Sequence, residues 1–540
     1  MTVPDIPQEG PHVVLVSTRT VLTLPDDSLL LTPATVIVSP ATGKIISAIP
    51  EIIPRSSFPS DTVYHDYSPK LLLPGLVDAH VHLNEPGRTE WEGFYTGTRA
   101  AASGGVTTVV DMPLNAVPPT TTLEGFKAKL AASQGQCWVD VGFYGGVIPG
   151  NADQLLPLVE AGVRGFKGFL IDSGVPEFPA VSSTDIELAM KTLKDAPTTL
   201  MFHAEIIPPI ADSVGDSVQV SDPPLRPRGE LNSYTTWLLS RPPAFETYAI
   251  EEILSIAHVA PDLHLHIVHL SAMECIPILR EARKKGIKIT AETCFHYLGF
   301  SSDEIEDGDT RHKCCPPIRN QVNQDRLWEE ISDPEGCIKT IVSDHSPCTP
   351  ELKLLPPHLQ SGHRPTMHQC DSGIDMTLPE EERLAAEEAE KARLDGPVEI
   401  QGDFFAAWGG VSSVGLGLPI LYTFAAEREA RGDITPSIVD IVRMCSQATA
   451  QQVGLAHCKG GIRAGMDADF AIFDDADVWT LRAADMRWKN RCSPWEGHTF
   501  RGRVHETWLR GQKIFELGGP NDGFVGGKPI GRAITEKRMK

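Results

Sequence analysis

The stretch Leu71-Leu72-Leu73-Pro74-Gly75-Leu76-Val77-Asp78-Ala79-His80-Val81-His82-Leu83 is an apolar run that ends in two histidines two residues apart. Because side chains alternate between the two faces of a β-strand, His80 and His82 project from the same face. An apolar strand gains little from two unpartnered imidazoles, whereas the pair can hold one metal ion. The stretch therefore predicts a strand that anchors a metal site.

After this strand, apolar strands and helices alternate along the chain. The expected strands are 106–111, 138–144, 165–169, 198–203, 263–269, 287–294 and 337–344. The expected helices are 98–103, 123–133, 152–161, 183–194, 245–258 and 272–285. About eight βα repeats fit a closed (β/α)₈ barrel, a TIM-like α/β fold, better than an open doubly wound sheet. No GxGxxG follows the first strand, which weakens a nucleotide-binding alternative.

Both ends of the chain have β character. Short β-branched strands are expected at 13–18, 21–24, 28–31, 35–39 and 44–49, and further strands at 460–473 and 503–516. We expect these ends to pair in a small, discontinuous β domain. The predicted boundaries are 1–72 and 458–540 for this domain and 73–457 for the barrel.

An insertion is predicted at 356–401, where the alternation breaks. It contains His358, His363 and His368, followed by an acidic stretch at 380–391 that reads as a solvated helix. A second metal site from these histidines is the weaker interpretation, because their spacing matches no recognised ligand pattern.

Composition limits the partners and the compartment. The chain has 540 residues, 41% of them hydrophobic, and a formal net charge of -23. Nucleic acid and anionic membranes are not expected partners, because both require clustered Lys and Arg. No apolar run approaches the roughly 18 residues of a membrane span, and the first ten residues do not resemble a signal peptide. The 11 cysteines form no CxxC pair and read as reduced thiols, so a cytoplasmic location is predicted.

Several chemically active side chains stand at the ends of the expected strands, where barrels carry their active sites. They are His80, His82, Lys167, His203, His269 and Asp344. Taken singly, a strand-end histidine is more often a hydrogen-bonded core residue, and a lysine can extend to solvent. Their recurrence at one rim predicts a metal centre.

Lys167 is the unusual member of this set, because an ammonium group repels a cation. An amine among metal ions is shifted toward its neutral form, which can react with carbon dioxide to give an anionic carbamate. Such a carboxylated lysine could bridge two ions.

The motifs DAHVHLNEPGRTEWEGF, GVRGFKGFL, FHAE, HIVHLS, ETCFHYL, IVSDHSPCTPELK and AAWGG resemble the amidohydrolase superfamily, and within it the allantoinase branch of the cyclic amidohydrolases. The resemblance runs from about His12 to Leu517. It implies a hydrolase that opens the cyclic amide of allantoin to give allantoate, and a homo-oligomer, either a dimer or a tetramer. Dihydropyrimidinase or hydantoinase activity is the alternative. A metal-free scaffold is disfavoured because every ligand position is filled.

The resemblance also assigns roles to the strand-end residues. It implies that His80, His82 and Asp344 bind the more buried ion, that His203 and His269 bind the second, and that carboxylated Lys167 bridges them. Zinc suits these ligands best, and manganese, cobalt or iron would also fit. Asp344 is expected to be catalytic, taking a proton from the attacking water and passing it to the departing nitrogen.

The sequence indicates the substrate-binding residues less clearly than the metal ligands. No tyrosine follows Lys167 where dihydropyrimidinases place one, and Ser173-Gly174 at that place resembles allantoinases. Leu83-Asn84 replaces the arginine pair by which dihydroorotases bind a carboxylate, and Arg88 reads as a solvated turn residue or a carboxylate ligand. The predicted substrate contacts are Cys315, through its backbone, with Ser173, Asn84 and Thr293 as weaker candidates.

Overall fold

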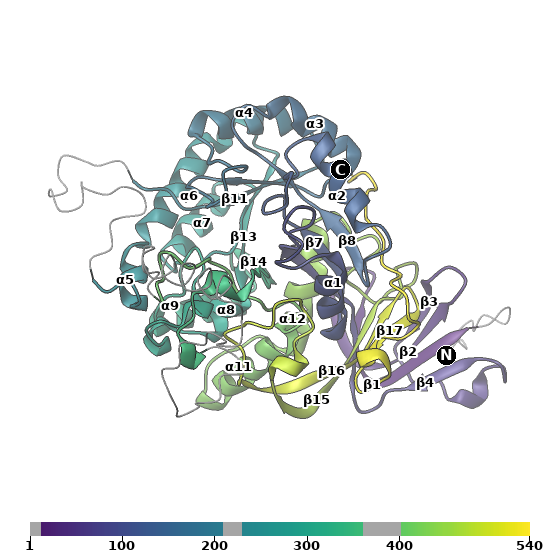
Figure 1. Cartoon of the computed structure of the whole chain (residues 1–540). Coiled ribbons are helices and arrows are strands. Elements are labelled where there is room, and N and C mark those ends of the chain that lie inside the picture. The colour runs from purple at the N-terminus through teal and green to yellow at the C-terminus, as the bar shows by residue number, and fades with distance from the viewer. Residues whose placement is uncertain (1–11, 209–228, 360–400, 540) are drawn as a thin grey trace, which may run out of the picture.

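The computed structural model describes residues 12–208, 229–359 and 401–539 (Figure 1). It contains a 6-stranded sheet, a 3-stranded sheet and an 8-stranded sheet. In Figure 1 the helices surround the first two sheets, and the third lies beside them at the N-terminal end of the chain. The chain is therefore an α/β protein with an additional β sheet.

The 6-stranded and 3-stranded sheets are parallel throughout. Their strands are almost entirely buried, as expected when helices cover a parallel sheet. The 3-stranded sheet consists of β6 (Leu76–Val81), β7 (Val106–Asp111) and β8 (Asp140–Phe143). The other contains β9 (Gly145–Gly146), β10 (Phe166–Phe169), β11 (Thr199–His203), β12 (His264–Ile267), β13 (Ile289–Cys294) and β14 (Ile338–Val342). The strands predicted from 106 to 344 are confirmed, β7 with the predicted bounds and the others with ends shifted by one or two residues. The stretch 71–83 was expected to be one strand and is instead two, because the strand breaks at Gly75 and its two halves join different sheets.

The two parallel sheets adjoin one another at both edges. Strands β8 and β9 are separated only by Tyr144. At the other edge Val81 of β6 forms a parallel bridge with His345, just beyond β14, and the His82 amide donates to the His345 carbonyl at 2.8 Å. The first and last strands are thus brought together around the site.

The helices between the strands are α1 (Phe94–Ser103), α2 (Leu123–Ser133), α3 (Ala152–Ala161), α4 (Ser183–Leu193), α5 (Tyr234–Leu239), α6 (Ala244–Ile256), α7 (Cys275–Lys284), α8 (Phe295–Gly299) and α9 (Gln321–Ser332). They are followed by α11 (Gly417–Arg431), α12 (Ile438–Val442) and α13 (Ala448–Gln452). Local signals fix several ends. Ser182 and Asp185 form a capping box at the start of α4, and α3 ends at Gly162 with φ 98°.

Helix α1 begins four residues before the predicted start at 98. The Glu85 side chain accepts from the Phe94 amide at 2.9 Å, which satisfies a donor of the first turn. That contact joins two loops, so the local pattern did not reveal it.

The 8-stranded sheet combines strands from both ends of the chain. Strand β5 (Leu71–Pro74) pairs with β1 (Val13–Thr23) and with β15 (Phe470–Thr480). The remaining strands are β2 (Leu29–Ser39), β3 (Lys44–Ile49), β4 (Val63–Asp66), β16 (Thr499–Leu509) and β17 (Gln512–Glu516). The predicted pairing of the two ends is therefore confirmed.

The predicted segmentation of this sheet was wrong in four places. The strand expected at 460–473 begins only at Phe470 and continues to Thr480 as β15. Segments 13–18 and 21–24 form one strand, β1, because an irregularity between Ser17 and Thr20 lets pairing with β2 continue. Segments 28–31 and 35–39 likewise form the single strand β2. The region 503–516 is instead two strands, since Arg510 and Gly511, both with positive φ, make a tight turn between them.

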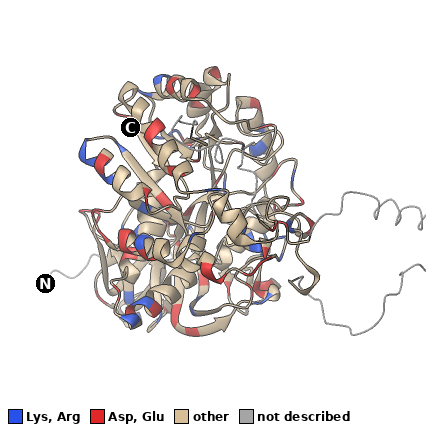
Figure 2. Ribbon diagram, turned by 90° about the vertical axis from the view of Figure 1, so that its left-hand side faces the viewer, with Lys and Arg blue, Asp and Glu red and all other residues tan. Residues whose placement is uncertain are grey.

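The largest hydrophobic cluster continues from the parallel strands into the 8-stranded sheet, where it includes Val21, Phe473 and Phe515. A second cluster, with Leu15, Val36 and Phe470, lies within the sheet itself. Lys and Arg are interspersed with Asp and Glu along the ribbon (Figure 2). No helix in the described ranges is long and apolar enough to cross a membrane, and the described cysteines are free thiols.

Most of the predicted insertion, including His363, His368 and the acidic stretch, lies outside the described residues. Within it, His358 belongs to a short 3₁₀ turn at Pro357–Leu359. The possible second metal site stays a prediction.

Candidate metal centre

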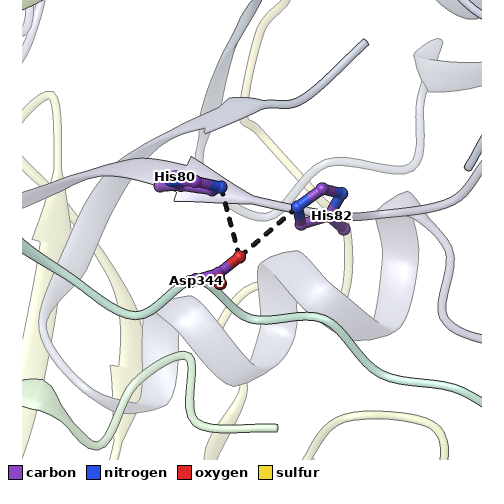
Figure 3. Close-up of side chains that lie close together, drawn as sticks. All are labelled: His80, His82 and Asp344. Atoms are coloured by element: carbon purple, nitrogen blue, oxygen red, sulfur yellow. Dashed lines mark ion pairs between the residues drawn. The ribbon is translucent and has the colours of Figure 1, made fainter. Parts of the chain in front are cut away.

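His80, at the end of β6, and His82, just beyond it, face Asp344 (Figure 3). The Nε2 atoms of His80 and His82 lie 3.2 Å and 3.4 Å from Asp344 Oδ1. One ligand atom from each of the three residues lies within 4.8 Å of the others, and all are buried. Asp344 holds this position with φ 43°, a left-handed conformation that is uncommon outside glycine and occurs at functional sites.

Lys167, on β10, lies beside this group. Its Nζ is 3.2 Å from His80 Nε2, and its side chain is buried. Burial lowers the pKa of Lys167 to about 8, although Asp344 opposes the shift. A larger share of the amine is therefore neutral near pH 7 than for an exposed lysine.

His203 and His269 form the other part of the centre. His203 ends β11, His269 follows β12, and His203 Nδ1 lies 3.1 Å from His269 Nε2. The rings of His269 and His80 have centroids 5.5 Å apart. His269 Nδ1 is buried and has no hydrogen-bond partner among the described residues. The structure thus brings all the predicted strand-end residues to one place.

Burial lowers the pKa of His82 to about 3 and those of His203 and His269 below their usual range. These imidazoles are therefore neutral at pH 7, which is the form that binds a metal. Asp344 keeps a low pKa because His80, His82 and His269 outweigh the effect of its burial.

Two glutamates that sequence reasoning missed support these histidines. Glu292 Oε1 lies 2.5 Å from His80 Nδ1, and Glu205 Oε2 lies 2.8 Å from His203 Nε2. A carboxylate that accepts one ring N–H fixes the tautomer and leaves the other nitrogen free to bind a metal. Here the free nitrogens are those that face the centre, so the donor set fits a metal site.

The pKa of each glutamate is about 2. In both cases burial opposes ionisation but is outweighed, at Glu292 by His80 and His266 and at Glu205 by Arg241 and His203. A charged residue within the buried strand β13 was the available signal for Glu292. His296 was also missed: it is fully buried, lies near Asp344 and Cys294, and neither ring nitrogen has a partner in the described structure.

The predicted substrate contacts differ in whether their polar groups are free to bind a substrate. Ser173 Oγ donates to the Phe178 carbonyl at 2.6 Å, and Thr293 Oγ1 donates to the Leu270 carbonyl at 2.9 Å. Asn84 Nδ2 donates to the Pro347 carbonyl, whereas its buried Oδ1 has no partner among the described residues. Cys315 is half-buried. Ser173 and Thr293 therefore use their hydroxyls to hold loops.

Arg88 is not a solvated turn residue. It is half-buried, donates to the Asn115 carbonyl at 2.7 Å and pairs with Glu177. Its charge is already matched by a carboxylate of the chain.

The comparisons agree with this geometry. Amidohydrolase family models match residues 71–222 and 417–515. The chain is 43% identical to an allantoinase of Saccharomyces cerevisiae, covering 94% of this chain and 96% of that one, and 38% identical to an allantoinase of Streptomyces avermitilis, covering 90% and 92%. An L-hydantoinase structure from Arthrobacter aurescens shares the fold, with a TM-score of 0.76, 23% identity and coverage of 97% and 99%. The chain therefore belongs to the allantoinase family of the amidohydrolases.

Proposed function

We propose that the chain hydrolyses the cyclic amide of allantoin to give allantoate. The observation that carries this proposal is similarity to allantoinases along nearly the whole chain, including 43% identity over 94% of it. The cluster of His80, His82 and Asp344 supplies a site suited to metal-dependent hydrolysis of a carbon-nitrogen bond.

Two divalent ions would be held in this centre. His80, His82 and Asp344 would bind one, and His203 and His269 the other. The facing atoms His203 Nδ1 and His269 Nε2, 3.1 Å apart, and the inward lone pairs that the glutamates fix on His80 and His203 support this assignment. Imidazole and carboxylate ligands suit zinc, and the same set could hold manganese, cobalt or iron.

Lys167 would bridge the ions as a carbamate. Its neutral amine attacks carbon dioxide, forms a carbon-nitrogen bond and releases a proton, leaving an anionic group with two oxygens. Burial of Lys167 and its position 3.2 Å from His80 support this step.

When bound, the ions would lower the pKa of a water molecule and polarise the ring carbonyl. Asp344 would accept the proton of the attacking water and return it to the departing ring nitrogen. Ser346 Oγ donates to Asp344 Oδ1 at 2.9 Å and orients this carboxylate. Asn84 and Cys315 would contact the substrate.

We also propose that the two parallel sheets form one closed (β/α)₈ barrel spanning 73–457. The bridge between Val81 and His345 supports closure. Segments 1–72 and 458–540 would form a separate small β domain, as the cluster around Leu15 and Phe470 suggests. A homodimer or homotetramer in the cytoplasm stays a prediction, to be checked by light scattering and cell fractionation.

Hydantoinase or dihydropyrimidinase activity is the second candidate, because similarly folded proteins carry those names. Steady-state hydrolysis of allantoin, hydantoin and dihydrouracil by one preparation separates the candidates. Faster turnover of allantoin supports the proposal. Faster turnover of dihydrouracil would retain the metal mechanism and contradict the substrate.

A further inference from the structure

A segment that sequence reasoning assigned to no role, Asp403–Val411, lies against the loops that form the candidate site. The Val411 carbonyl accepts from the Ser346 amide at 3.0 Å, and Ser346 in turn bonds Asp344. A Cβ placed on Gly409 would lie 3.8 Å from Cys315 Sγ. We call Asp403–Val411 the rim segment.

Trp408 is the large side chain at the centre of the rim segment. Its ring packs against Trp91, with centroids 4.6 Å apart. A Cβ placed on Gly174 would lie 4.0 Å from its Cζ3 atom. The indole therefore lies between the loop that follows the His80 strand and the loop that follows the Lys167 strand.

Two buried lysines fix the backbone on either side of this indole. Lys313 Nζ donates to the carbonyls of Phe405, at 3.1 Å, and Ala407. Lys353 Nζ donates to the carbonyls of Trp408, at 3.1 Å, and Gly410, at 2.5 Å. Within the described part of the chain neither ammonium group has a carboxylate at ion-pair distance.

Burying ammonium groups against neutral carbonyls costs free energy compared with hydration. This arrangement holds a short loop in one conformation at the rim of the site. Backbone bonds add to it, since the Trp408 amide donates to the Leu352 carbonyl and the Gly410 amide to the Lys313 carbonyl, each at 2.7 Å. Trp408 is thus presented from a fixed backbone.

The indole N–H of Trp408 is buried and has no hydrogen-bond partner among the described residues. A buried donor without an acceptor is costly, and native structures satisfy most such groups. The Oδ1 atom of Asn84, a predicted substrate contact, is likewise buried and unpaired among the described residues. A ligand could thus find one buried donor, on Trp408, and one buried acceptor, on Asn84, that the described residues leave unpaired.

We propose that Trp408 is a specificity-determining residue whose indole N–H donates to the carbonyl oxygen of a ureido group on the substrate. This rests on the proposed function, since allantoin is a hydantoin ring that carries a ureido substituent. Hydantoin itself lacks the substituent. The contact would therefore select between two substrates that offer the same ring to the metal centre.

The variant Trp408→Phe keeps an aromatic ring against Trp91 and removes the donor. We expect kcat/KM for allantoin to fall by about 3- to 10-fold, the effect of one neutral hydrogen bond. The inhibition constant of hydantoin, measured against allantoin hydrolysis, should change by less than about twofold. Trp91→Phe is the matched control, because it alters the other ring of the pair but keeps the Trp408 donor. It should change kcat/KM for allantoin and the affinity for hydantoin by the same factor.

Metal content and melting temperature are measured for each variant. Equal losses for allantoin and hydantoin, or no loss for either, would overturn the role of Trp408 while leaving the proposed function intact. Failure of the unaltered chain to hydrolyse allantoin would overturn both.

A second measurement does not depend on the folding of Trp408→Phe at full stability. The chain carrying Asp344→Asn is labelled with ¹⁵N-tryptophan and titrated with allantoin and then with hydantoin. Allantoin should shift the Trp408 indole resonance and hydantoin should not. Identical shifts with both ligands would contradict the contact.

Discussion

Glu292 joins two histidines in the interior of the parallel sheets, with Oε1 2.5 Å from His80 Nδ1 and Oε2 3.1 Å from His266 Nε2. All three residues are fully buried. The carboxylate fixes the tautomer of His80 so that Nε2, the nitrogen near Lys167 and Asp344, keeps its lone pair. Glu292 therefore orients a ligand of the metal centre although it need not contact a metal itself.

Replacing Glu292 with Gln tests this support. The amide has nearly the same shape but loses the charge and offers only one acceptor, so metal affinity should fall by about 10- to 100-fold. Mass spectrometry of metal content across a chelator series measures the change. The control Glu281→Gln removes an exposed carboxylate that pairs with Lys285 and should not alter metal content. Unchanged affinity in Glu292→Gln would contradict the role given to this residue.

Carboxylation of Lys167 predicts a dependence on carbon dioxide. Metal-free chain given zinc in carbon dioxide-free buffer should regain little activity, and added bicarbonate should restore it. Lys167→Met removes the amine, and we expect turnover to fall by at least about 100-fold with no response to bicarbonate. Intact-mass measurement checks for one added carbon dioxide per chain. Full recovery without bicarbonate would rule out the carbamate.

Asp344→Asn tests the proton-transfer role. The amide oxygen can still bind a metal, but the group can no longer accept the proton, so kcat should fall by about 10²- to 10⁴-fold. Asp172→Asn alters an exposed carboxylate after the Lys167 strand and should leave kcat near normal. Near-normal turnover of Asp344→Asn with full metal content would be incompatible with the assignment.

Lys459 holds three carboxylates where the parallel sheets meet the 8-stranded sheet. Its buried Nζ lies 2.6 Å from Asp140, 2.9 Å from Asp467 and 2.8 Å from Asp469. Lys459→Met would leave Asp469 buried without a cation, whereas Asp140 keeps Arg510 and Asp467 keeps Lys44, and it should lower the free energy of unfolding by about 3–5 kcal/mol. Thermal unfolding measures the loss. Lys288→Met breaks an exposed pair with Asp262 and should cost less than about 1 kcal/mol.

The loss of unfolding free energy caused by Lys459→Met should depend on pH. In the unaltered chain Lys459 lowers the pKa of Asp467 against the effect of burial, so this contribution to stability is lost as pH falls. Burial already raises the pKa of Asp469 against the effect of Lys459, so without Lys459 this pKa rises further and protonation relieves the destabilising charge. The difference between the two chains should therefore be smaller at about pH 4.5 than at about pH 8. A difference that widens on acidification would contradict the charge account.

The residues of the centre could be predicted because strand ends are local features. Parallel strands place their carboxyl ends at one edge, so His80, Lys167 and His203 were expected together before any contact was known. The β character of both chain ends was readable for the same reason. The strand boundaries could be predicted less well. Strand β1 continues through an irregularity between Ser17 and Thr20 that depends on its pairing with β2.

The supporting contacts could not be predicted because they join distant parts of the chain. Glu292 meets His80 across 212 positions, and no spacing rule relates them. Ser173 was a reasonable substrate contact from its position, yet its hydroxyl donates to Phe178 in its own loop. The position of Trp408 is fixed by Lys313 and Lys353, which lie outside the rim segment. The motif AAWGG alone therefore gave no reason to expect Trp408 to contact the substrate.

Titration of the metal-free chain with zinc in bicarbonate buffer, with allantoin hydrolysis followed at each addition, tests the central claim most directly. The account predicts no turnover without metal and a rise in activity that ends at about two ions per chain. Allantoin hydrolysis at full rate in the chelated, metal-free chain would contradict it.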